Sequence, residues 1–153
     1  MGEKIIEVNK RGGVISSYTH DLIRKNRANG ICIDEQDNSI WILCFDNVLL
    51  HFDASFILID SFDINYWDQD MIVSNGEFLY FTVGADYQGD NNFIVSFNKK
   101  THEIKTEYRV LQSYAIEGVV VLDGKILVMN DGLFHKAAIP KTYISVYEGH
   151  ISK

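Results

Sequence analysis

Apolar and polar residues alternate with a period of two along most of the chain, and each alternating run ends in a turn. Four runs share one layout, in which an apolar strand is followed by a short polar turn and the start of a second strand. They surround Val8, Phe52, Phe97 and Tyr147, which lie 44, 45 and 50 residues apart. Alternation interrupted by turns at a regular spacing predicts pairs of antiparallel strands repeated along the chain.

A second series of short apolar runs lies between those of the first. These runs begin at Gly30, Met71 and Gly118, which are 41 and 47 residues apart. A turn dipeptide and another apolar strand follow each of them: the turns are Asp37-Asn38, Asn75-Gly76 and Asp123-Gly124, and the strands are Ile40–Phe45, Phe78–Val83 and Ile126–Met129. Asn-Gly and Asp-Gly favour hairpins, because a type I′ turn needs positive φ at both central residues.

Together the two series predict units of four antiparallel strands, each unit about 40 to 50 residues long. The first strand of a unit is apolar throughout and is expected to be the most buried, whereas the fourth, such as Ile104–Tyr108, is more polar. A β-propeller blade has this layout. Helical periodicity is missing except for one turn expected within His20–Asn26. We therefore predict an all-β fold of propeller-type blades, with a compact β-sandwich or barrel as the alternative.

The units predict a single all-β domain of about three and a half blades. Residues 1–26 form the end of a blade, 27–65 and 66–111 form two complete blades, and 112–153 form an incomplete one. A closed propeller has four to eight blades, and an open sheet edge exposes unpaired backbone groups. We therefore expect other protein chains, further copies or a longer polypeptide to complete the propeller.

The repeat resembles propeller repeats in the broad sense, such as the NHL and YVTN types and the gluconolactonase-like and SdiA-regulated families. This resemblance covers essentially the whole chain and rests on repeat length and strand pattern. It lacks the dipeptide signatures of WD repeats, since Gly149-His150 lies in a different strand context, and the kelch-type double glycine occurs once, at Gly12-Gly13. The resemblance implies a propeller fold and leaves the function open.

Three oxygen-bearing side chains, those of Asn29, Asp70 and Glu117, come directly before or at the start of the first strands of the units. Aligned blades would bring them to one mouth of a central channel, where Ca²⁺ or Mg²⁺ would find the oxygen ligands it prefers. Asn29-Gly30 and Glu117-Gly118 are similar to strand openings of the gluconolactonase-like family, which implies a metal-dependent lactonase or esterase. The unit order and blade number differ from that family. The alternative is that these side chains bind nearby backbone.

Two further groups are candidate binding residues. Tyr66 and Trp67 lie in a connection between units, where they either stack against a sugar or peptide or fill the space between blades. Asn130, Asp131 and His135 belong to the longest loop of the last unit, where either Asp131 and His135 act as an acid–base pair or the residues form a tight turn and a solvated loop. Neither a Gly-x-Ser-x-Gly nucleophile motif nor a zinc-ligand spacing accompanies them.

Composition narrows the classes of partner. The net charge of −7 and the pI near 5.1 argue against non-specific nucleic-acid binding. A membrane span and a signal peptide are not indicated by the sequence. Cys32 and Cys44 are expected as buried free thiols on adjacent strands and the same sheet face, which favours the cytoplasm or an assembled particle.

These observations favour a non-catalytic function. We expect an acidic protein-binding or assembly module, a structural protein built on propeller blades, which binds a protein partner or itself and neither nucleic acid nor membrane. A metal-dependent hydrolase and a carbohydrate-binding propeller are the alternatives. No cofactor is identified beyond the Ca²⁺ or Mg²⁺ of the hydrolase hypothesis.

Overall fold

The computed structural model describes residues 4–84, 92–111, 113, 115–131 and 142–148. These residues form one short helix and four antiparallel sheets. A hairpin of β1 (Ile5–Val8) and β2 (Val14–Tyr18) comes first and is followed by α1 (Asp21–Asn26). The next sheet contains β3 (Ala28–Ile33), β4 (Ile40–Cys44), β5 (Val48–Phe52) and β6 (Leu58–Asp63). The third contains β7 (Ile72–Asn75), β8 (Phe78–Val83), β9 (Phe93–Asn98) and β10 (Glu103–Arg109), and the last contains β11 (Ile116–Leu122), β12 (Lys125–Asn130) and β13 (Tyr143–Glu148).

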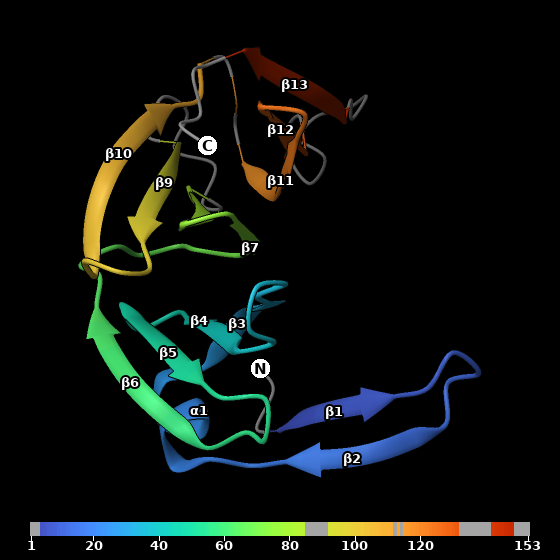
Figure 1. The fold of residues 1–153 in the computed structure, drawn as a ribbon. Coiled ribbons are helices and arrows are strands. Elements are labelled where there is room, and N and C mark those ends of the chain that lie inside the picture. Colours follow the sequence, from blue (N-terminus) through green and yellow to red (C-terminus); the bar gives the residue numbers. More distant parts are fainter. Residues whose placement is uncertain (1–3, 85–91, 112, 114, 132–141, 149–153) are drawn as a thin grey trace.

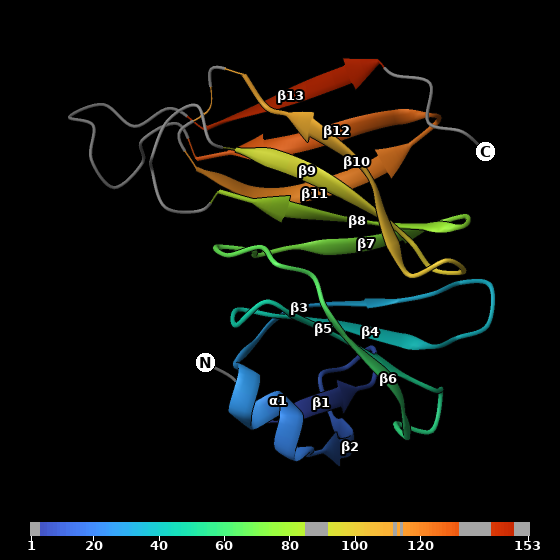
Figure 2. The ribbon, with the colours of Figure 1, turned by 90° about the vertical axis from the view of Figure 1, so that its left-hand side faces the viewer.

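The sheets follow one another around an arc (Figure 1). Within each larger sheet the strands are ordered as in the sequence, with β3, β7 and β11 on the inner side of the arc and β6, β10 and β13 on the outer side. Seen from the side, the sheets are stacked layers (Figure 2). The predicted all-β fold of propeller-type blades is confirmed. In the described part of the chain, no helix is long and apolar enough to span a membrane.

The turns form for the conformational reasons expected from their residues. Asp123 and Gly124 form the two-residue connection of β11 and β12, with φ of 50° and 73°. Positive φ at both positions is the type I′ geometry, which matches the twist of paired strands. The second turn differs from the expectation, because Asn75 pairs with Phe78 and belongs to β7. Its connection is Gly76-Glu77, where only Gly76 has positive φ.

Burial follows a different gradient from the one expected. The second strands, β4 and β8, are the most buried, whereas β3 alternates between buried and exposed positions. An inner strand is the edge of its sheet and faces the open interior of the arc, so it is covered on fewer sides than the strand beside it. The outer strands β6 and β10 are largely exposed, as expected.

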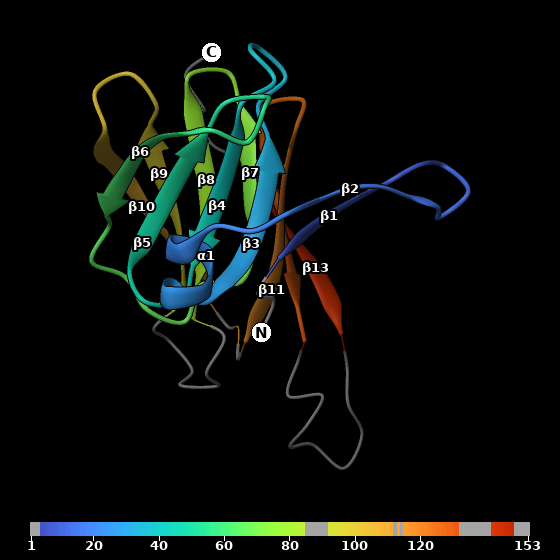
Figure 3. The ribbon, with the colours of Figure 1, turned by 90° about the horizontal axis from the view of Figure 1, so that it is seen from below.

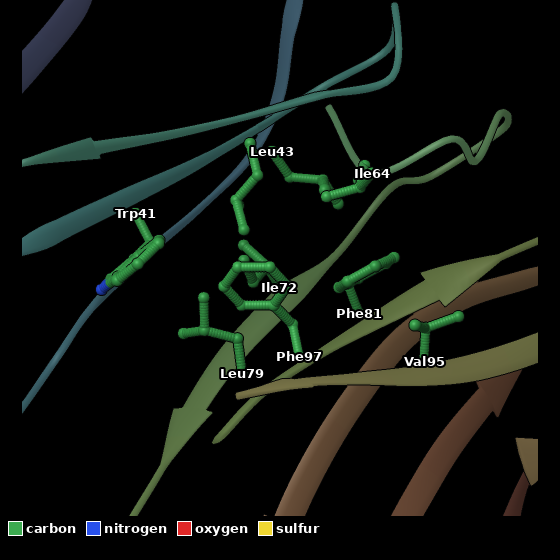
Figure 4. Packing of buried hydrophobic residues seen from close by; sticks show 9 residues of the cluster. Trp41, Leu43, Ile64, Ile72, Leu79, Phe81, Val95 and Phe97 are labelled. Carbon is green, nitrogen blue, oxygen red and sulfur yellow. The ribbon is translucent and has the colours of Figure 1, made fainter. Parts of the chain in front are cut away.

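Sheets pack face to face through apolar clusters. Between the β3–β6 and β7–β10 sheets lie Trp41, Leu43, Leu79, Phe81 and Phe97, which point toward one another in Figure 4. A second cluster joins the β7–β10 sheet to the β11–β13 sheet and contains Phe78, Tyr80, Ile94, Val119, Ile126 and Val128. Each of these interfaces combines the apolar face of one sheet with the opposite face of the next, as in stacked repeats.

Helix α1 covers the remaining face of the β3–β6 sheet. Its Ile23 is fully buried among Ile42, Cys44, Leu50 and Phe52. The helix begins at His20, whose Nδ1 accepts a hydrogen bond from the Leu22 amide, as N-cap side chains do. One end of the stack is therefore covered by a helix of the same chain.

The two cysteines lie on opposite faces of this sheet, so the expectation of a shared face was wrong. Cys32 packs against the Trp41 cluster and Cys44 packs against α1. Cys32 is paired with Trp41, and Cys44 lies three positions beyond Trp41 in β4, so regular alternation places the two thiols on opposite faces. Both thiols are free.

Candidate interaction surface

The β11–β13 sheet has two apolar faces, and only one of them is covered. Val119 and Val128 are paired across strands and are buried against the β7–β10 sheet. On the opposite face Val120 pairs with Leu127, which also pairs with Val146, and Met129 pairs with Ile144. We call the face formed by Val120, Leu122, Leu127, Met129, Ile144 and Val146 the end face.

The end face is exposed over most of its area. The exposed fractions are 50% for Val120, 51% for Met129, 60% for Ile144 and 54% for Val146. The equivalent faces of the two preceding sheets are the buried ones that pack against their neighbours. A contiguous exposed apolar patch of this kind is typical of an interaction site.

The end face continues onto the neighbouring sheet as a groove. Met71, directly before β7, lines this groove together with Val120, Met129 and Ile144. At the other side of the face, Lys125 and Glu148 form an exposed ion pair of 2.8 Å between β12 and β13. An apolar centre bordered by charged residues is the usual layout of a protein interface.

The hairpin β1–β2, with its turn, is a second exposed apolar element, and we call residues 5–18 the arm. Figure 3 shows it projecting away from the stacked sheets. At its base Ile5 packs against the β3–β6 sheet, and the ring of Tyr18 stacks on Phe56 with 4.6 Å between centroids. Beyond the base its apolar side chains are exposed: Ile6 by 44%, Val8 by 54%, Val14 by 65% and Ile15 by 57%.

The structure brings together two of the three predicted metal ligands. The amide of Asn29 donates hydrogen bonds to the Asp70 carboxylate and to the Gln69 carbonyl. Burial raises the pKa of Asp70, and the Asn29 hydrogen bond opposes that rise. Glu117 is exposed on β11 and lines the groove beside Met71. Within the described residues, no three His, Cys, Asp or Glu side chains are gathered to hold a metal ion, and the metal site stays a prediction.

The predicted binding residues have different surroundings. Trp67 is 58% exposed, so it does not fill the space between sheets; Tyr66 does this instead, packing edge-on against Phe81 and donating a hydrogen bond to Glu107. Asn130 is fully buried and bonds Val128 and Ser145, and Asp131 is 6% exposed. His135 lies outside the described residues.

A polar cluster between the first two large sheets was not identified from the sequence. Lys99 forms an ion pair with Asp34 and a 3.1 Å hydrogen bond to Ser74. Beside it, His51 stacks on Trp41 at 3.7 Å between ring centroids. Burial lowers the pKa of His51, while hydrogen bonds from Ser39 lower the pKa of Asp37. No sequence spacing signals this cluster, because Asp34 and Lys99 are 65 residues apart.

The end face was also not predicted from the sequence, although the residue pattern of one strand indicates it. The strand Gly118–Leu122 is apolar at successive positions and so presents apolar side chains on both faces. Such a strand is expected where both faces are covered. Here one cover is supplied by the β7–β10 sheet and the other is not part of the described chain.

Solved structures similar to this chain are β-propellers. The WD40 domain of Neurospora crassa Pan2 is 12% identical with a TM-score of 0.68, and covers 95% of this chain. Kuenenia stuttgartiensis hydrazine synthase is 14% identical with a TM-score of 0.69, and covers 95%. A Bacteroides caccae protein of unknown function is 16% identical with a TM-score of 0.64, and covers 92%.

This chain spans only part of those structures, namely 43%, 45% and 54% of their chains in the same order. No protein-family profile matches the sequence, and no curated protein matches it. The likeness therefore concerns the fold, and the chain has the fold of a β-propeller segment in which four sheets form an open arc.

Proposed function

We propose that this chain is a non-catalytic assembly module, which binds protein through its end face and so contributes blades to a larger propeller. One observation carries the proposal: the end face has the composition and position of the sheet faces that are buried elsewhere in the stack. Covering such a face removes apolar area from water, which is the main favourable term in protein association.

Two further observations support this function. The similar structures include a WD40 domain, a fold class that serves in protein interaction. In addition, the groups that the sequence offered for catalysis are scattered in the structure, since Asn130 and Asp131 are buried while Glu117 is exposed on another strand. The contact between Asn29 and Asp70 supports the metal-dependent hydrolase as the second candidate.

Site-specific photo-cross-linking in cells that produce the chain tests the assembly function. A photoreactive amino acid in place of Val120 probes the end face, and the same group in place of Leu111 is the control. Leu111 is 61% exposed but lies in the turn after β10. We expect protein adducts from position 120 and none from position 111. If the chain forms no protein adduct from either position, the proposal is contradicted.

A further inference from the structure

We propose that the partner of the end face is a second copy of this chain, whose arm lies on that face, so that two copies join head to tail in a ring. This inference rests on the assembly function proposed above and names its partner. Two exposed apolar surfaces among the described residues, the end face and the arm, lie at opposite ends of one arc. Figure 1 shows that the arc is open between them.

A single partner of this kind covers both surfaces. Within one chain the described contacts of the arm lie near its base, where Ile5 and Tyr18 pack against the β3–β6 sheet and its turn, and where Ile6 lines a pocket with residues of β3. Val8 and Val14 of the arm are then 54% and 65% exposed, and Val120 of the end face is 50% exposed. An isolated two-stranded hairpin is marginally stable in water, so a sheet face to lie on stabilises the arm. Packing one end face on another would leave both arms exposed.

Charge favours the same pairing. The arm and Lys4 beside it carry three basic residues, Lys4, Lys10 and Arg11, and one acidic residue, Glu7. The described part of the last sheet exposes three acidic side chains, those of Glu117, Asp123 and Glu148, and one lysine, Lys125. The arm is thus basic in a chain whose net charge is −7, and the exposed charges described on the last sheet are mostly acidic. Opposite charge on two patches steers them together and disfavours pairing of either patch with itself.

The extent of the arc agrees with two copies. The chain spans 43%, 45% and 54% of three propeller chains that it matches and 32% to 35% of four others, so two arcs supply about the extent of one chain of the first group. Two copies related by a twofold axis place the arm of each on the end face of the other. Such closure gives a finite dimer rather than an open fibre.

Sedimentation velocity on residues 1–153 tests the proposal with two complementary variants. Val120→Asp places a charge on the end face, and Val8→Asp places one on the arm; both positions are exposed, so both variants are expected to fold. At about 100 µM, where a complex with a Kd of about 1 µM is almost fully formed, the unmodified chain should be dimeric. Each variant alone should be largely monomeric, with its Kd raised about a thousandfold, because a charge is buried in both of its arm-to-face contacts. Leu111→Asp should dimerise like the unmodified chain.

Mixing the two variants decides the arrangement. A ring formed from one Val120→Asp chain and one Val8→Asp chain keeps one unmodified arm-to-face contact, so the mixture should contain dimers that neither variant forms alone. A monomeric unmodified chain, a dimeric Val8→Asp variant, or a mixture without dimers would overturn the proposal. If the photoreactive group at position 120 forms adducts with a different protein and the chain is monomeric, a second copy is not the partner, but the assembly function still holds. If position 120 forms no protein adduct and the chain is also monomeric, both the assembly function and the proposed partner are wrong.

Discussion

The ammonium group of Lys99, after β9, lies against the carboxylate of Asp34, after β3, and this ion pair joins two neighbouring sheets. The side chains are 10% and 5% exposed, so water solvates neither charge fully. Lys99 also donates to Ser74 and Gln36. A buried pair with these additional hydrogen bonds holds the two sheets in a defined register. If the sheets shifted, each charge would stay buried without its partner, which is unfavourable.

Removing one partner of this pair should therefore be costly. We expect Lys99→Met to lower the free energy of unfolding by about 3 kcal/mol, since it leaves the Asp34 carboxylate buried and unpaired. The double variant Lys99→Met/Asp34→Asn should lose less than the sum of the single variants. Urea unfolding measures both. In the exposed Lys125–Glu148 pair, Lys125→Met should cost less than about 1 kcal/mol; equal losses at the two sites would contradict this account.

Gly30 and Gly118 hold corresponding positions in the first strands of two sheets, but only Gly30 is closely packed. A Cβ at Gly30 would lie 2.9 Å from the backbone oxygen of Asp70, whereas a Cβ at Gly118 would meet Met129 at 3.4 Å. Gly30→Ala should push β3 away from β7 and destabilise the fold by about 1–3 kcal/mol. Gly118→Ala should be neutral or stabilising by up to about 1 kcal/mol, because alanine restricts the unfolded chain. Thermal unfolding of the two variants compares them, and a greater loss at Gly118 would refute the packing argument.

His51 should make stability depend on pH. Burial lowers its pKa below 6.5, an effect that Asp37, Asp34 and Asp60 oppose and His102 reinforces. Between pH 6.5 and the lower native pKa, the unfolded chain binds more protons than the folded one, so stability falls as the pH falls through this window. His51→Gln should flatten that part of the profile measured by urea unfolding. A profile as steep as that of the unmodified chain would show that other groups carry the dependence.

Both cysteine thiols should be unreactive in the native state. Burial raises the pKa of Cys32 and of Cys44 to about 12 in each case. Because the thiolate is the reactive form, iodoacetamide at pH 8 should modify neither thiol until the chain is unfolded. Intact-mass measurement before and after addition of urea follows the modification. Rapid native labelling of Cys44, which is fully buried, would mean that α1 opens readily.

The hypothesis of a divalent-cation site makes a separate prediction. If Asn29, Asp70 and Glu117 bind Ca²⁺, millimolar Ca²⁺ should raise the melting temperature, because a ligand that binds only the folded state stabilises it. EDTA should reverse the shift, and Glu117→Ala should abolish it. Glu77→Ala, which changes a carboxylate on the turn between β7 and β8, is the control. An unchanged melting temperature with Ca²⁺ would exclude this site.

Local patterns determined much of the fold, because they act over a few residues. Asp123-Gly124 turns where the sequence placed a turn, since few other residues accept positive φ at both positions. The strand Phe78–Val83 has the predicted bounds, because its apolar residues fit a pleated, buried surface. The sequence also indicated that Asn29 and Asp70 would lie together, and their hydrogen bond agrees with that alignment.

Tertiary structure decided what no local pattern contains. The Lys99–Asp34 pair depends on how one sheet is placed on the next, and Trp67 became exposed while Tyr66 took the interior position. Above all, the sequence showed that β11 and β12 have two apolar faces, but not which of them would be covered. Periodicity reports the side on which a residue lies, whereas burial depends on whether another sheet reaches that side. By itself the sequence therefore determined the repeated strands, and only the packing of sheets along the arc decided that Val120 and its neighbours remain exposed for a partner.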